Sequence, residues 1–232
     1  MNSSINILIA GSSGMVGNTI LDKCLQREDV NSVTCFVRKS SANKHPKLIE
    51  IVHEDFLDFS GKEHYFKNKD ICFYCIGVYT GAVPKEEFNK ITIDYTASFA
   101  KILKQKSPYV VFSFLSGQGA DSLEKSSVLF AKSKGIAENI LKNLKFKQLN
   151  IFRPGYIYPI KKRKEPNTFY RIFRPLYKYF FSFIYPNIGI SSVDLANVMI
   201  ALAFEENSKS IFENKDIRNK ISKVWKKNLQ QL

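Results

Sequence analysis

The first 27 residues combine a short apolar segment, a glycine-rich turn and a helical pattern, in that order. Residues 5–10 have the apolar composition of a buried strand. Three glycines at a spacing of three follow, and such glycines permit a tight turn, let the backbone approach a phosphate and let the helix pack on the strand. The N-terminus of the next helix then directs free N–H groups and its positive dipole end at an anion. Unless this is an ordinary strand–helix turn, it predicts a dinucleotide pyrophosphate site formed by Gly11, Ser13, Gly14, Met15, Val16 and Gly17.

Apolar segments and helical patterns alternate along the rest of the chain. Several of the apolar segments are almost continuous, as in strands that are buried on both faces of a parallel sheet. The predicted fold class is therefore α/β, a doubly wound parallel sheet of the Rossmann type. We expect residues 1–232 to form one domain, with 156–232 contributing a small C-terminal lid or substrate region. Further strands are predicted at 33–37, 48–52, 70–76, 109–115 and 148–152, and helices at 85–106, 122–144 and 191–206, the last capped by Ser191 with Asp194 in its first turn.

The composition is that of a globular protein, with 44% hydrophobic and 24% charged residues. The sequence shows no basic leader followed by an apolar signal region, and no apolar run of about 20 residues. Cys72 and Cys75 have the spacing of a redox or metal motif, but they lie in an apolar strand without a second ligand pair. We therefore expect reduced thiols, no metal and a cytoplasmic location.

The net charge of +14 comes from 35 basic and 21 acidic residues. Such an excess is compatible with nucleic acid, a membrane surface or an anionic ligand. Residues 161–187 interleave lysines and arginines with phenylalanines and tyrosines. This segment fits a lid over the substrate, or a peripheral helix on an anionic membrane. No nucleic-acid-binding motif accompanies it, so we do not expect a nucleic-acid partner.

The ends of the second, third and fourth predicted strands carry candidate cofactor contacts. Arg38 and Lys39 stand where NAD-binding sites usually have an acidic residue, which favours the 2′-phosphate of NADP over NAD unless both are plain surface residues. Asp55 and Phe56 are expected along the adenine, with a plain turn as the alternative for Asp55. The remaining candidates are Cys75, Ile76 and Gly77. Gly77 would bring backbone close to the cofactor at the end of the fourth strand, unless it is an ordinary turn glycine.

Three further stretches point to a family. They are Cys75-Ile76-Gly77, residues 115–121 (Leu-Ser-Gly-Gln-Gly-Ala-Asp) and residues 152–155 (Phe-Arg-Pro-Gly), together with Lys134-Gly135. In order and spacing, residues 5–160 resemble the atypical and extended short-chain dehydrogenase/reductases, and among them the HIV-Tat-interacting oxidoreductase-like branch. The resemblance implies a Rossmann fold, bound NADP(H) and a small C-terminal substrate region. Pro154 and Gly155 are expected to shape the nicotinamide pocket, unless they simply end the sixth strand.

The resemblance also implies catalytic residues, and here the sequence departs from the family. The family uses a Tyr-x-x-x-Lys pair with a strand-end serine; this chain has Phe130 and Lys134, and Ser116 is followed by Gly117. A phenyl ring cannot transfer a proton, and losing a general acid typically costs about 10²–10⁴ in rate.

Several groups remain as proton sources for a chain that lacks this tyrosine. They are the phenols of Tyr79 and Tyr156, the Ser116 hydroxyl and solvent. The alternative for the two tyrosines is aromatic packing beside the cofactor. The sequence therefore supports two hypotheses. The first is an oxidoreductase for a small carbonyl or alcohol substrate, with Ser116 and Lys134 as catalytic residues. Lys134 is also expected to contact the cofactor, unless it is a solvated helix lysine. The second is a non-catalytic NADP(H)-binding sensor or interaction protein.

Overall fold

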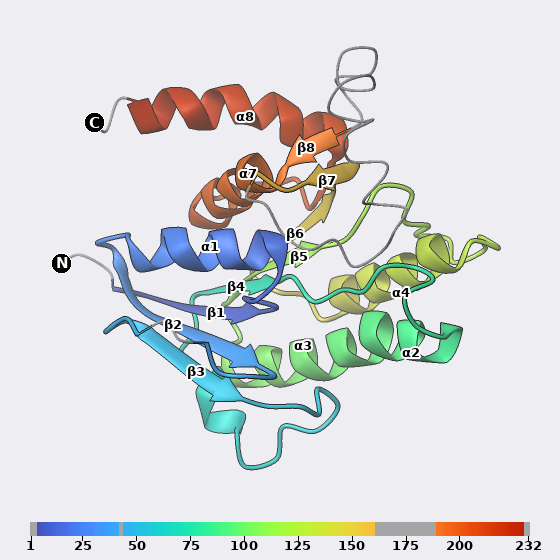
Figure 1. Cartoon of the computed structure of the whole chain (residues 1–232), viewed down its shortest axis with the longest axis horizontal. Helices are drawn as coiled ribbons and strands as arrows, with labels where there is room; N and C mark the ends of the chain where they lie inside the picture. The colour runs from blue at the N-terminus through green and yellow to red at the C-terminus, as the bar shows by residue number, and fades with distance from the viewer. Residues whose placement is uncertain (1–3, 42–43, 161–188, 230–232) are drawn as a thin grey trace.

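A seven-stranded parallel sheet forms the centre of the computed structural model, which describes residues 4–41, 44–160 and 189–229 (Figure 1). The strand order β3-β2-β1-β4-β5-β6-β9 reverses direction between β1 and β4. This order confirms the predicted doubly wound α/β fold. Two shorter strands, β7 and β8, form a separate parallel pair. The strands are β1 (Ile5–Ala10), β2 (Val30–Val37), β3 (Leu48–Val52), β4 (Ile71–Tyr74), β5 (Val111–Leu115), β6 (Gln148–Arg153), β7 (Tyr156–Tyr158), β8 (Gly189–Ser191) and β9 (Ile211–Glu213).

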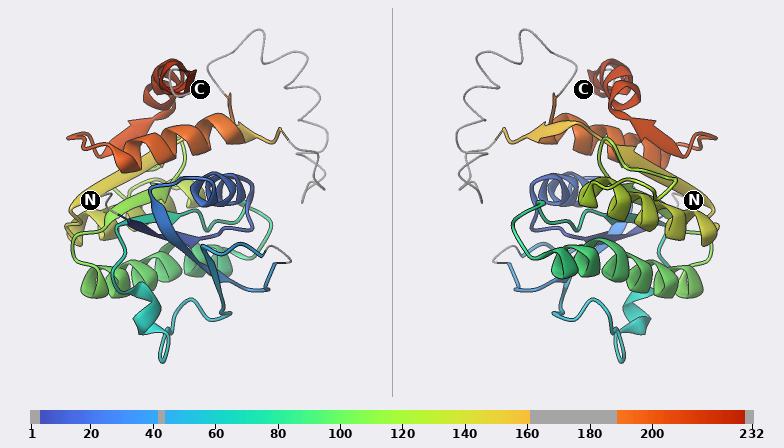
Figure 2. Two further views of the ribbon diagram at one scale, coloured as in Figure 1. Left: turned by 90° about the vertical axis from the view of Figure 1, so that its left-hand side faces the viewer. Right: turned by 90° about the vertical axis from the view of Figure 1, so that its right-hand side faces the viewer.

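Helices cover both faces of the sheet (Figures 1 and 2). On one face α1 (Met15–Leu25) packs beside α7 (Ser192–Phe204), and α8 (Asn214–Leu229) lies on α7. The other face carries α2 (Lys85–Asn89), α3 (Tyr95–Lys106) and α4 (Leu129–Asn143). A π-helical segment, η2 (Lys90–Asp94), joins α2 to α3, so the predicted helix over 85–106 is confirmed as one continuous path. A short 3-10 helix, η1 (Glu63–Phe66), precedes β4.

The two faces of the sheet bury separate apolar clusters. Along β1, Ile7 and Ile9 face the cluster that includes α1 and α7, whereas Leu8 and Ala10 face the cluster that includes α3 and α4. All four side chains have no exposed surface. Because successive strand residues point to opposite faces and both faces are covered, the central strands must be apolar at nearly every position.

The predicted helix over 122–144 is wrong at its start, since α4 begins only at Leu129. The carboxylate of Asp121 accepts hydrogen bonds from the backbone N–H groups of Leu123 at 2.9 Å, Lys125 at 2.8 Å and Ser126 at 2.7 Å. These bonds hold residues 121–128 in turns, because an aspartate side chain competes with helical backbone bonding.

The C-terminal third contains elements that the sequence patterns did not predict. The capped start of α7 is confirmed, because the Ser191 hydroxyl accepts a hydrogen bond from the Asp194 N–H at 2.9 Å, but the helix ends at Phe204 rather than near 206. β7, β8, β9 and α8 were not predicted. Residues 161–187 lie outside the described residues. None of the helices in the described ranges is long and apolar enough to cross a bilayer. The lid interpretation of 156–232 stays a prediction.

Candidate functional site

The glycine-rich turn lies between the carboxyl ends of β1 and β4, where the strand order reverses. Gly11 has a φ of +86°, and a Cβ atom there would lie 2.7 Å from the carbonyl carbon of Cys75. A Cβ atom on Gly17 would lie 2.2 Å from the carbonyl oxygen of Gly11. Both positions therefore require glycine for close packing of strand, turn and helix.

The start of α1 is open to an anion. Gly14 is the N-cap and provides no side-chain cap, and the first turn of α1 contains no acidic residue. The first N–H groups of a helix have no partners within the helix, so a phosphate is a suitable acceptor for them. The residues present thus fit the pyrophosphate of a dinucleotide.

A cavity of about 570 Å³, here called the central cavity, opens beside this turn. Its volume is typical of small-molecule sites. Of the residues predicted from the sequence, the cavity brings together Gly14, Met15, Val16, Gly17, Cys75, Ile76, Gly77, Ser116, Lys134, Pro154 and Gly155. Tyr79, Gly117, Phe130 and Tyr156 also line it, together with Val78, Leu115, Gln118 and Ile157. Segments far apart in the sequence thus meet at the carboxyl edge of the sheet.

Lys134 is held inside this cavity with 6% of its surface exposed. Its Nζ atom donates to the carbonyl oxygen of Leu115 at 3.2 Å and lies 5.0 Å from the centre of the Phe114 ring. Burial lowers the pKa of Lys134 to about 8, while Glu138 and the thiol of Cys75 act in the opposite direction. At neutral pH the side chain is therefore mostly an ammonium ion.

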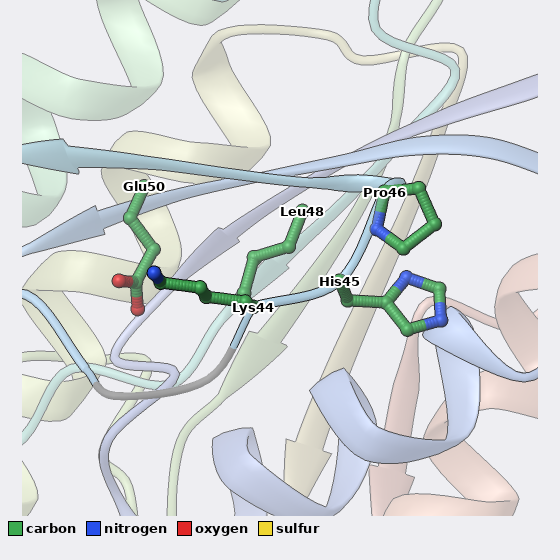
Figure 3. Close-up of a pocket in the computed structure, with 5 residues that line it drawn as sticks. All are labelled: Lys44, His45, Pro46, Leu48 and Glu50. Atoms are coloured by element: carbon green, nitrogen blue, oxygen red, sulfur yellow. The ribbon is translucent and has the colours of Figure 1, made fainter.

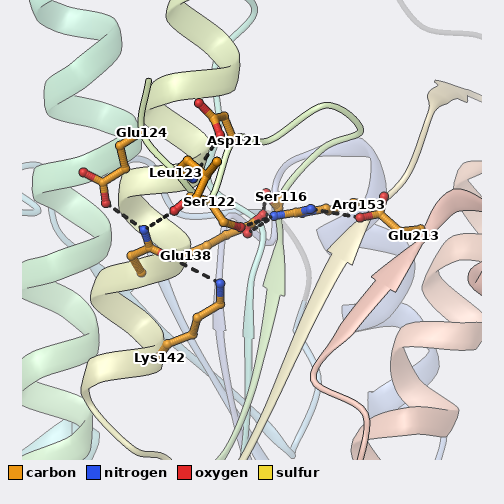
Figure 4. A network of polar contacts seen from close by, with 10 residues as sticks. Ser116, Asp121, Ser122, Leu123, Glu124, Glu138, Lys142, Arg153 and Glu213 are labelled. Carbon is orange, nitrogen blue, oxygen red and sulfur yellow. Dashed lines mark hydrogen bonds and ion pairs between the residues drawn. The ribbon is translucent and has the colours of Figure 1, made fainter. Parts of the chain in front are cut away.

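Ser116 belongs to a buried polar network (Figure 4). Its hydroxyl donates to the Oε1 atom of Glu138 at 2.6 Å, and Glu138 has no exposed surface. Arg153 donates to both carboxylate oxygens of Glu138, to Ser122 at 2.8 Å and to Glu213 at 2.9 Å. The hydrogen bond to Glu138 raises the pKa of Arg153. Because the Ser116 hydroxyl donates its proton to Glu138, its oxygen is left as a hydrogen-bond acceptor at the cavity wall.

The sequence patterns predicted no role for Glu138 or Arg153. Glu138 follows Lys134 by four residues, so the two lie on one face of α4, and that spacing was the available signal. Arg153 stands within the Phe-Arg-Pro-Gly stretch that carried the family resemblance.

Phe130 and Gly117 fit together as a pair. A Cβ atom on Gly117 would lie 2.4 Å from the Cζ atom of Phe130, so the phenyl ring fills the space that a side chain at 117 would need. The two departures from the family, at positions 130 and 117, are therefore coupled through packing, because the ring of Phe130 occupies the space beside Gly117.

The candidates for the adenosine end, and Ser13 of the glycine turn, do not line the central cavity. Arg38 and Lys39 are exposed directly after β2, and Ser13 is exposed in the glycine turn. The Oδ1 atom of Asp55 accepts from the N–H of Leu57 at 2.9 Å, as in a turn. Phe56 is 4% exposed and belongs to the cluster on the α3 face. None of these five lines the central cavity, and their contacts with a cofactor stay predictions.

A second hollow of about 410 Å³ lies beside the edge strand β3 (Figure 3). It is lined by Lys44, His45, Pro46, Leu48 and Glu50. The Glu50 carboxylate accepts from the Ser40 hydroxyl at 3.0 Å and from the Ser41 N–H at 2.9 Å, so its role is to hold the loop after β2.

The cysteines are all unpaired thiols. Burial raises the pKa of Cys75 to about 12 and that of Cys72 well above its ordinary value, so both remain protonated at neutral pH. Within the described ranges, no group of three or more His, Cys, Asp or Glu side chains is placed to hold a metal ion.

A parallel sheet with a glycine turn and a cavity at its switch point defines the Rossmann class of NAD(P)-binding proteins. The chain belongs to the NAD dependent epimerase/dehydratase family, whose model matches residues 7–153. The rat protein HTATIP2 is 27% identical over 164 residues, which are 69% of this chain and 66% of the rat protein. The chain thus spans just under two thirds of that relative. Protein fmp52-2, mitochondrial, from Aspergillus oryzae is 28% identical over 158 residues, 67% of this chain and 69% of the fungal protein.

Solved structures share the fold at low sequence identity. A UDP-N-acetylglucosamine 4-epimerase from Methanobrevibacter ruminantium M1 superimposes with a TM-score of 0.67 at 19% identity, over 91% of this chain and 76% of the epimerase. The enzyme WbmF from Bordetella bronchiseptica, solved in complex with NAD+, gives a TM-score of 0.66 at 16% identity, over 95% and 78% of the two chains.

Proposed function

We propose that this protein binds NADP(H) and acts as an oxidoreductase on a small carbonyl or alcohol substrate. The observation that carries the proposal is the convergence of the glycine turn, Lys134 and the ends of β4, β5 and β6 on one cavity. When bound, the dinucleotide supplies a hydride to a carbonyl carbon, or accepts one from an alcohol carbon. Cofactor binding by homologues of this fold supports the first part, since the related enzyme WbmF was solved with NAD+.

The residues of the central cavity have separate tasks in this proposal. The N–H groups at the start of α1 hold the pyrophosphate. The Lys134 ammonium binds the ribose beside the nicotinamide. The Ser116 oxygen, whose own proton is donated to Glu138, accepts a hydrogen bond from a substrate hydroxyl. The substrate oxygen takes its proton from Tyr156 or Tyr79, because both phenols line the cavity and Phe130 has none.

Preference for NADP is proposed from the charge after β2. Arg38 and Lys39 are both exposed there and available to a 2′-phosphate. Titration with NADPH and NADH, followed by nicotinamide fluorescence, should give micromolar binding of NADPH and much weaker binding of NADH. Arg38→Ala should weaken NADPH binding about tenfold or more and leave NADH binding unchanged. Lys67→Ala, at an exposed lysine before β4, is the matched control. Equal binding of the two dinucleotides would contradict the preference.

Turnover with a panel of small aldehydes and ketones tests the catalytic part. Tyr156→Phe or Tyr79→Phe should lower kcat by about 10²-fold or more if that phenol is the proton donor. NADPH affinity should change little in the same variant. Efficient turnover that survives both substitutions would remove the phenols from the mechanism.

A second candidate function follows from the contact between Phe130 and Gly117. Since the phenyl ring occupies the place of the usual phenol, the cavity suits a non-catalytic NADP(H)-binding sensor or interaction protein. Phe130→Tyr distinguishes the two candidates. A parent protein that is silent with every carbonyl, and a variant that gains turnover, would favour the sensor. Efficient reduction by the parent protein would exclude it.

Location and partners extend the proposal. Four unpaired cysteines, three of them buried, support a reducing compartment such as the cytoplasm. Contact of residues 161–187 with an anionic membrane surface is compatible with either function and rests on composition alone.

A further inference from the structure

The walls of the central cavity carry one kind of charge. Among the described residues that line it, Lys134 is the only one with a formal charge at neutral pH. Glu138 lies behind Ser116 and is paired with Arg153, so its carboxylate does not present a free negative charge to the cavity. The cavity is therefore electropositive at the end where α4 meets β5.

Among the described residues Lys134 forms no direct ion pair, although the carboxylate of Glu138 acts on it at longer range. Its Nζ atom donates to a neutral carbonyl, that of Leu115, and lies near the ring of Phe114. With 6% of its surface exposed, the side chain is also shielded from water, which otherwise screens its field. Its field therefore acts strongly on whatever fills the cavity.

Phe130 removes a group that would offset this charge. A phenol at this position, beside a buried ammonium ion, would ionise readily and supply a negative charge. A phenyl ring stays neutral at every pH. The substitution at 130 thus affects the electrostatics of the cavity as well as the transfer of a proton.

We propose that the central cavity discriminates between the redox states of a nicotinamide dinucleotide and binds the reduced form more tightly than the oxidised form. This proposal rests on the function proposed above. The oxidised nicotinamide ring carries a positive charge, whereas the reduced ring is neutral. Like charges repel, and they do so more strongly where water is excluded. In an oxidoreductase this preference favours carbonyl reduction and rapid release of the oxidised product; in a sensor it makes occupancy follow the reduced pool.

Calorimetric titration of the purified chain at neutral pH and 0.15 M salt tests the proposal, with NADPH, NADP+, NADH and NAD+ as probes. We expect the Kd of the oxidised form to exceed that of the reduced form about tenfold or more. Gln118→Glu adds a carboxylate at the cavity wall through an exposed side chain, while the backbone N–H of residue 118 keeps its bond to the Pro154 carbonyl. This variant should lower the ratio of the two dissociation constants several-fold, because the added carboxylate strengthens binding of the oxidised form.

Two lysine variants complete the design. Lys134→Met removes the charge at the cavity wall and should also lower the ratio of the oxidised-form Kd to the reduced-form Kd. Lys132→Met removes an exposed charge two residues away on the same helix, and should leave the ratio unchanged. If Lys134→Met does not fold or bind, Gln118→Glu decides the question alone.

The results of these titrations distinguish a failure of this proposal from a failure of the proposed function. Binding of both redox forms with equal affinity would overturn this proposal and leave the proposed function intact. A large ratio that persists in Gln118→Glu and Lys134→Met would overturn its electrostatic cause. Failure of the parent protein to bind any of the four dinucleotides would overturn the proposed function, and this proposal with it.

Discussion

The ion pair between Glu138 and Arg153 offers a double-mutant cycle with a large expected coupling. Removing one partner of a buried pair costs about 3–5 kcal/mol, because the other charge is left in a poorly solvated place. Glu138→Leu leaves Arg153, whose side chain is 11% exposed, with its second partner Glu213. We therefore expect a loss near the lower limit, about 3 kcal/mol. Arg153→Met leaves a carboxylate with no exposed surface, whose one remaining hydrogen bond among the described residues comes from the Ser116 hydroxyl, so we expect about 5 kcal/mol.

The double variant Glu138→Leu/Arg153→Met should be more stable than Arg153→Met alone. Apolar replacement of both members removes the buried charges together, and such replacements are often close to neutral. Ser116, Ser122 and Glu213 each lose a partner, at about 1 kcal/mol apiece, so the double variant should lose about 3 kcal/mol rather than the sum of about 8. The coupling energy is then about 5 kcal/mol.

Urea unfolding followed by far-ultraviolet circular dichroism gives the three free energies of unfolding. A variant in which only Lys209, the exposed partner of Asp216, is changed to Met controls for the loss of a surface ion pair and should change stability by less than about 1 kcal/mol. Additive losses in the double variant would refute the reasoning. So would single variants within 1 kcal/mol of the parent, since the pair would then be solvated.

Three further predictions concern packing, pH and surfaces. Gly17→Ala should lower the melting temperature, because its Cβ would lie 2.2 Å from the Gly11 carbonyl oxygen; Gly77→Ala, where the space is open, should melt like the parent. Burial lowers the pKa of Lys134 to about 8 in the folded chain, whereas an unfolded lysine has a pKa of about 10.4. Between these two pH values Lys134 is protonated to a greater extent in the unfolded chain than in the folded chain. The stability of the parent relative to Lys134→Met should therefore rise with pH across that window and stay constant below it; a falling difference would contradict the assignment. The membrane interpretation of residues 161–187 predicts sedimentation with anionic vesicles at low salt, and its absence would remove that interpretation.

Local sequence patterns were enough to predict the glycine turn, the buried strands and the helix at 85–106. The glycine spacing reports a close approach between Gly11, Gly17 and the end of β4 that no other residue allows. The apolar strands were recognisable because burial on both faces leaves no room for alternation. The helix at 85–106 was predicted as one element, but its π-helical segment was not predicted from the apolar spacing.

Tertiary contacts decided what the sequence could not reveal. The turn at 121–128 depends on one carboxylate bonding three backbone amides, which overrides the local helical pattern. Gly117 looked like a lost serine, and only the position of the Phe130 ring shows that the two residues fit each other. The role of Glu138 depends on Ser116, which directly follows β5, and on Arg153, which ends β6. The three-residue strand β9 is too short to give a recognisable pattern.

The attachment of β9 and α8 to the end of β6 has a consequence for biosynthesis. Glu213 binds Arg153, and the Oδ1 atom of Asn214 accepts from the N–H of Gly155 at 3.0 Å, in the wall of the central cavity. The glycine turn needs only residues 5–76 for its close contacts. The bond of Gly155, in contrast, requires Asn214, which is translated 59 positions later. A nascent chain therefore forms its glycine-rich turn early and the part of the cavity wall at Gly155 late. Until residue 214 leaves the ribosome, the growing polypeptide holds an unfinished site whose buried charges still lack part of their compensation.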